Sequence, residues 1–143
     1  MHVRVVYHSH WGNTAKLAHA IAEVFSISPE QIGKDEISFP EVVDLLFLGD
    51  GIYWAKPHKL TRKFFKQLDS TSIKNAAVFA TYGNQIKIGD DIKRLLQEKG
   101  INVLGEPFTC QGASVGTKNQ GHPDETDLQN VKEFAKNIAS KLS

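Results

Sequence analysis

The sequence has only one cysteine, Cys110, and no excess of charge of either sign. A single thiol cannot form a disulfide within the chain, and it excludes a cysteine-rich metal site. Four of the histidines show no ligand spacing with one another or with Cys110, so we expect no metal centre; they are His2, His19, His58 and His122. The 17 basic and 16 acidic residues give a formal net charge of +1, which lacks the basic footprint of a protein that binds nucleic acid or a membrane surface.

Long hydrophobic runs are also missing. The longest apolar stretches, 45–48 and 76–80, are far shorter than the ~20 residues that a helix needs to span a bilayer. The first ten residues lack the apolar core and the cleavage site of a secretory signal, so we expect a cytoplasmic protein. The 143 residues, of which 41% are hydrophobic and 23% charged, are typical of one globular domain spanning 1–143.

Short apolar segments alternate with amphipathic ones along the chain. Residues 3–7, 44–48, 76–81 and 101–110 are predicted strands, the last of them broken near Gly105 and Pro107. Apolar residues at helical spacing predict helices over 14–25, 57–68, 89–99 and 124–142. The segment 26–40 is ambiguous and holds a short strand around 31–33 or around 36–39. This alternation predicts an α/β/α sandwich, in which helices cover both faces of a five-stranded parallel sheet of order 2-1-3-4-5.

In such a sheet a ligand binds beyond the carboxyl ends of the strands, and the first of these ends is rich in hydrogen-bond donors. Hydroxyls, an amide and a glycine stand where the first helix begins, and backbone N–H groups at a helix N-terminus attract anions. The loop therefore suits a phosphate, although an ordinary capped turn would use the same residue types. Its residues are Ser9, His10, Trp11, Gly12, Asn13 and Thr14.

Two further loops at the same edge combine glycines with aromatic side chains. Glycine permits close approach of the backbone to a ligand, and aromatic rings can stack on a flat one. Together with the phosphate loop they predict a mononucleotide with a large planar ring, which favours flavin mononucleotide (FMN) over an adenine nucleotide. Their candidate residues are Gly51, Ile52, Tyr53 and Trp54 in one loop and Thr81, Tyr82, Gly83 and Asn84 in the other.

The residues 9–14 resemble the phosphate loop of the flavodoxin family, S/T-x-T-G-N-T, in the position where that family places it. Residues 46–49 followed by Tyr53, Trp54 and Pro57 are similar to the third strand and loop of flavodoxin-like proteins. Residues 108–112, 121–123 and 127–128 resemble the last strand and last helix of small bacterial members. The resemblance implies a short-chain flavodoxin-like fold, one non-covalent FMN, and one- or two-electron transfer between redox partner proteins, a reductase and an acceptor.

The sequence departs from the family pattern at three points. Trp11 replaces a threonine of the phosphate loop, which removes one hydroxyl donor. A hydrogen bond contributes about 0.5–1.5 kcal/mol, so FMN would bind about tenfold more weakly unless His8 or His10 compensates. Asp50 and Gly51 stand where a small hydroxyl residue and proline are usual, and we expect the Asp50 carboxylate to turn away and cap the next turn. The balanced charge replaces the acidic surface of the family, leaving a local rim of Asp50, Asp90, Asp91 and Asp124.

Other functions remain open. A flavin-dependent reductase of the NAD(P)H:quinone type would share the fold and the FMN, although the chain shows no nicotinamide fingerprint. A binding module that keeps the fold but has lost FMN is a third hypothesis, motivated by Trp11 and Asp50. A basic cluster forms a solvated face of the second helix or contacts an acidic partner. Its members are Lys56, His58, Lys59, Arg62, Lys63 and Lys66.

Overall fold

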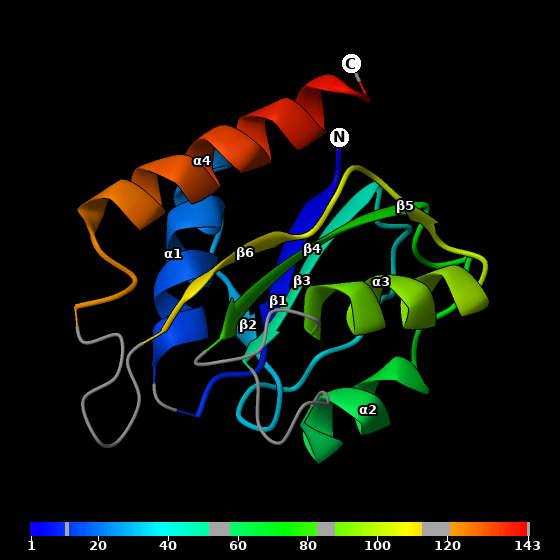
Figure 1. Cartoon of the computed structure of the whole chain (residues 1–143). Coiled ribbons are helices and arrows are strands. Elements are labelled where there is room, and N and C mark those ends of the chain that lie inside the picture. The colour runs from blue at the N-terminus through cyan, green and yellow to red at the C-terminus, as the bar shows by residue number, and fades with distance from the viewer. Residues whose placement is uncertain (11, 52–57, 83–87, 113–120, 143) are drawn as a thin grey trace.

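The sheet and its helices are seen in a computed structural model, which describes residues 1–10, 12–51, 58–82, 88–112 and 121–142. One sheet is covered by α1 and α4 on one face and by α2 and α3 on the other (Figure 1). The strands are β1 (Val3–Tyr7), β2 (Glu30–Gln31), β3 (Leu45–Gly51), β4 (Asn75–Tyr82), β5 (Asn102–Val103) and β6 (Phe108–Gln111). The helices are α1 (Asn13–Val24), α2 (Lys59–Phe65), α3 (Ile88–Glu98) and α4 (Glu125–Ser140).

All strand pairs are parallel, in the order β2-β1-β3-β4, and both β5 and β6 pair with β4. The predicted order 2-1-3-4-5 is confirmed, with the fifth place divided between two short strands. The chain leaves the ladder between them, where Gly105 has a φ of +68°. The expected break near Gly105 and Pro107 is therefore present.

Neighbouring side chains on each strand enter different cores. Val5 and Phe47 pack with α1 and α4, whereas Val6 and Leu48 pack with α2 and α3. This alternation follows from the period of two along a strand, and a sheet buried on both faces needs apolar residues at every position. It explains why the strands have continuous apolar sequences.

Several predicted boundaries were wrong. β3 was expected to end before Gly49, but it continues through Asp50 and Gly51, which pair with Ala80 and Thr81 of β4. α2 begins at Lys59, with His58 as its N-cap, rather than at Pro57, which lies outside the described residues. Of the two positions considered for the second strand, the observed β2 is nearer the first. Among the helices that the structure describes, none is long and apolar enough to cross a membrane.

The edge strand β2 is held to β1 by one arginine. Arg4 of β1 donates from Nε and Nη2 to the two carboxylate oxygens of Glu30, at 2.7 and 2.6 Å. Its guanidinium also lies 4.6 Å from the centre of the Phe39 ring. A bidentate pair fixes both distance and orientation. The polar β2, which lacks an apolar pattern, is therefore positioned by this contact as well as by its ladder.

Substitution of Gly49 by alanine should destabilise the fold. Gly49 and Phe79 are opposite each other on β3 and β4, and a methyl group on Gly49 would overlap the fully buried Phe79 ring. Overpacking of this kind costs about 1–3 kcal/mol, to be measured as the free energy of unfolding in urea. The pair Gly49→Ala with Phe79→Leu should lose less stability than the sum of the single changes; simple additivity would contradict the proposed overlap.

Candidate functional site

The carboxyl ends of β1, β3, β4 and β6 lie together at one edge of the sheet. Tyr7 is opposite Gly49, Gly51 is opposite Thr81, and Tyr82 is opposite Gln111. The chain passes from β1 to β2 on one side and returns to β3 on the other, so the strand order reverses between β1 and β3. A ligand crevice is expected at this reversal in an open α/β sheet.

The loop between β1 and α1 leaves the N-terminus of α1 without a capping side chain. Gly12 is the N-cap, with a φ of +89°, and its N–H donates to Ser9 Oγ at 3.1 Å. Apart from the two chain neighbours of Gly12, no atom of the described residues lies within 4 Å of a Cβ built on this glycine. No acidic residue stands in the first turn of α1. The positive end of this helix thus lacks a negative group of its own.

The other helices supply their own N-terminal partners. Asp124 caps α4 in a reciprocal capping box with Asp127, and α3 carries Asp90 and Asp91 in its first turn. At α2 the His58 ring accepts from the N–H of Leu60 at 3.1 Å. Because an uncapped helix start is stabilised by an anion, the contrast identifies α1 as the helix suited to one.

Two buried hydroxyls join this loop to the end of β4. Thr14 Oγ1 and Thr81 Oγ1 are 2.9 Å apart, and the two residues are 1% and 4% exposed. Asn13 approaches the chain just after β6, where a Cβ on Gly112 would lie 2.9 Å from the Asn13 amide nitrogen. Glycine at 112 therefore allows the first loop and the end of β6 to lie in contact.

Asp50 carries the most buried carboxylate of the edge. Its side chain is fully buried, and Oδ1 accepts from the Gly51 N–H at 2.7 Å and from His8 Nδ1 at 3.1 Å. Oδ2 accepts from the N–H of His58 at 3.0 Å. A buried carboxylate is tolerated only when such donors surround it. Asp50 thereby connects the end of β1, the end of β3 and the start of α2.

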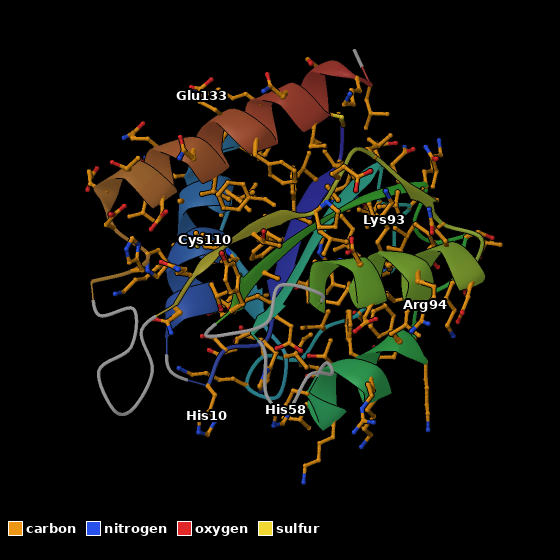
Figure 2. All side chains as sticks on the ribbon, viewed as in Figure 1. His10, His58, Lys93, Arg94, Cys110 and Glu133 are labelled. Atoms are coloured by element: carbon orange, nitrogen blue, oxygen red, sulfur yellow. The ribbon has the colours of Figure 1, made fainter. Side chains whose placement is uncertain are left out.

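The His8 and His58 rings stack with centres 4.0 Å apart and an interplanar angle of 20°. Burial, then the nearby His8, lowers the pKa of His58. The cap agrees with this direction, because His58 Nδ1 must be unprotonated to accept from Leu60 N–H. Figure 2 shows His58 at the start of α2, at the same end of the molecule as His10. Burial and the stacked His8 ring therefore favour a neutral His58, and the nearby Asp50 opposes them only in part.

The structure describes eight of the predicted site residues, and it brings several of them together. Thr14 contacts Thr81, Ser9 contacts Gly12, and Gly51 pairs with Thr81 across the sheet. His10 is exposed, and Asn13 and Tyr82 are half-buried. The remaining predicted residues lie outside the described residues, and their placement stays a prediction: Trp11, Ile52, Tyr53, Trp54, Gly83 and Asn84.

Asp50 confirms one expectation and overturns another. Its carboxylate turns to the N-cap residue of α2, as the sequence led us to expect. It cannot belong to an acidic rim, because it is fully buried. Its cluster with His8 and His58 was missed, since the three residues come from separate segments; the one signal was a charge at the end of an apolar strand.

Four further titratable side chains near this edge have structural explanations. Cys110 is buried on β6, and burial raises its pKa to about 12, so it is a poor nucleophile. His122, Asp124 and Asp127 lie close enough to suggest a metal site. Their contacts are those of the α4 capping box, to which His122 Nδ1 adds a hydrogen bond to Asp127 Oδ2 at 2.7 Å. This bond raises the pKa of His122.

The environment of His58 should be visible in an NMR titration of its ring. We expect the pKa of His58 to lie below the ordinary 6.5, and His8→Gln to raise it, because glutamine keeps a donor for Asp50 but removes the neighbouring imidazole. A depressed pKa contributes stability that is present above pH 6.5 and is lost as the pH falls through the folded-state value. Titration of His58 above 6.5 would contradict the stacked, buried pair.

Comparison with known proteins gives one relative at the sequence level. The chain is 34% identical to the uncharacterized protein MJ0298 of Methanocaldococcus jannaschii, over 96% of this chain and 98% of that protein. No protein-family model matches the sequence.

Solved structures show the same fold at lower identity. A flavodoxin from the domain Archaea superposes with a TM-score of 0.82 and 22% identity, covering 99% of this chain and 98% of that one. Flavodoxin 2 from Bacillus cereus superposes with a TM-score of 0.77 and 18% identity, with 99% of each chain covered. A short-chain flavodoxin associated with a bacterial microcompartment superposes with a TM-score of 0.76 and 16% identity, with both chains fully covered. The chain belongs to the same protein family as MJ0298, and its fold is flavodoxin-like.

Proposed function

We propose that this protein binds FMN and transfers electrons between redox partner proteins. The observation that carries the proposal is the N-terminus of α1, which lies at the reversal of strand order with neither a side-chain cap nor an acidic first turn. A phosphate supplies the negative charge that this helix start lacks.

The residues around this helix start fit the phosphate of FMN. Ser9, Thr14 and Asn13 offer hydroxyl and amide donors, and the described residues place no carboxylate in the loop. Thr14 has one hydroxyl hydrogen, so it can donate to a phosphate while accepting from Thr81. Neutral hydrogen-bond donors and the helix dipole can hold the phosphate dianion of FMN without the help of a lysine.

The ring of FMN would lie between the loops that follow β3 and β4. Gly51, Thr81 and Tyr82 are at the ends of these strands, and Trp54 and Tyr82 are the proposed stacking residues. When bound, FMN supplies one- or two-electron transfer, and the protein holds it and sets its surroundings. Solved flavodoxins with the same fold support this assignment, and a cytoplasmic location stays a prediction.

Comparison of FMN with riboflavin isolates the phosphate site. We expect the purified protein to quench FMN fluorescence on binding and to bind riboflavin, which lacks the phosphate, far more weakly. Thr14→Val removes the hydroxyl at nearly constant shape and should weaken FMN about tenfold, with little effect on riboflavin. Thr126→Val, on the exposed side of α4, is the matched control and should leave both affinities unchanged.

Thr81→Val separates phosphate binding from the loss of the Thr14–Thr81 hydrogen bond. It removes that bond but leaves the Thr14 hydroxyl, so FMN affinity should fall less than in Thr14→Val. Absence of FMN binding by the folded protein would favour the flavin-free binding module. Rapid oxidation of NAD(P)H by the FMN-loaded protein would favour the reductase instead of the carrier.

A further inference from the structure

One face of α2 carries unneutralised positive charge. Lys59, Arg62, Lys63 and Lys66 are exposed, and we call them the α2 basic face. Within the part of the chain that the structure describes, none of the four is in an ion pair. By contrast, basic residues elsewhere, such as Lys93, pair with carboxylates. The positive field of this face is therefore not cancelled by its immediate neighbours.

The α2 basic face makes the charge distribution of the protein uneven. Residues 58–68 contain no aspartate or glutamate. Without the four cations, the rest of the chain has 13 basic and 16 acidic residues, a formal net charge of −3. The formal charge of +1 thus hides a positive face on a protein that is otherwise negative. Such a distribution orients a charged partner during encounter.

The α2 basic face begins next to the candidate cofactor site. Lys59 follows His58, whose N–H is bound to Asp50 and whose ring lies on His8. The start of α2, marked by His58, is at the same end of the molecule as His10 of the phosphate loop (Figure 2). A protein docked on this face would lie close to the proposed FMN site. Short distance matters there, because the rate of electron transfer falls steeply with the distance between donor and acceptor.

An apolar hollow adjoins the charged residues. Lys63 lines it together with Ile37, Leu60 and Phe64, and its volume is about 190 Å³. Asp35 also lines the hollow, and its carboxylate accepts the Gln31 N–H. Protein interfaces combine an apolar centre with a charged, solvated rim. The hollow supplies such a centre, and the α2 basic face supplies the rim.

We propose that the α2 basic face and its hollow dock an acidic redox protein, whose carboxylates meet Lys59, Arg62, Lys63 and Lys66. This rests on the proposed function for its redox role, but the docking itself does not require bound FMN. The partner's electron-transfer centre would then lie near the carboxyl edge of the sheet. Charge complementarity sets mainly the association rate and the orientation of the complex.

NMR mapping with two redox proteins of opposite charge tests the docking surface. The labelled protein, with and without FMN, is titrated with an acidic 2Fe–2S ferredoxin and with a basic c-type cytochrome. We expect the ferredoxin to shift the amide signals of 58–68 and the cytochrome to leave them unchanged. Affinity for the ferredoxin should fall about tenfold between about 20 mM and about 200 mM salt.

Two variants with equal net charge separate the face from the overall charge. Replacing Lys59, Arg62, Lys63 and Lys66 by glutamine should weaken ferredoxin binding by about tenfold or more. The control replaces Lys74, Lys99, Lys136 and Lys141, which are exposed elsewhere, and should bind within about twofold of the natural protein. Equal loss in both variants, or amide shifts centred away from α2, would overturn the proposal.

Further measurements distinguish the class of partner, and they separate the docking surface from the FMN-carrier function. The proposal of a protein partner would be overturned if residues 58–68 bound a short RNA or phosphatidylserine vesicles more tightly than the ferredoxin. If FMN never binds but the ferredoxin still docks on α2, the carrier function fails while the surface stands. If FMN binds and reduced protein passes electrons to the ferredoxin equally well in both glutamine variants, the surface fails while the carrier function stands.

Discussion

A buried carboxylate that needs three donors organises the functional edge. The oxygens of Asp50 accept from a ring on the β1 loop, from the peptide that follows on β3, and from the first peptide of α2. Loss of any donor would leave charge uncompensated away from water, at a cost of several kcal/mol. The end of β1 and both flanks of the segment after β3 are therefore fixed to one another. Gly51, the last described residue before that segment, and His58, the first after it, share the same acceptor.

The helices α1, α2 and α4 differ in how their N-termini are satisfied. α4 is closed by a reciprocal capping box, and α2 by a histidine that Asp50 itself holds in place. Each of these two helices has an N–H of its first turn bonded by its N-cap side chain, which stabilises the fold. The N-cap of α1 is instead Gly12, whose backbone is in the left-handed region. A glycine has no side chain that could accept a hydrogen bond from the first N–H groups of the helix. The absence of a cap is thus a property of the residue that the turn requires.

The sequence predicted the layers and strand order because their signals are local. β1 matches its predicted bounds of 3–7, since its apolar run is short and bounded by polar residues. β3 was cut short because Gly49-Asp50-Gly51 looks like a turn, whereas the pairing of Asp50 and Gly51 with Ala80 and Thr81 extends the ladder past the first glycine. β2 has no apolar pattern and depends on the contact of Arg4 with Glu30. The stacking of His8 on His58 joins residues 50 positions apart, which no local pattern encodes.

The net charge gave a poor picture of the surface for a related reason. It sums charges over the whole chain, whereas the fold places them on different faces. Among the carboxylates expected near the site, Asp50 is fully buried, and Asp124 is engaged in the cap of α4. Asp50 is therefore removed from the expected rim, whereas Asp124 and Asp90 are exposed. The cations of α2, in contrast, lie at 59, 62, 63 and 66, a spacing that places them on the solvent side of a helix whose Phe64 and Phe65 are buried. Folding thus buries one carboxylate of the edge and leaves the cations of α2 exposed beside it. We therefore propose that a protein of balanced composition can select its partner by the sign of the partner's charge.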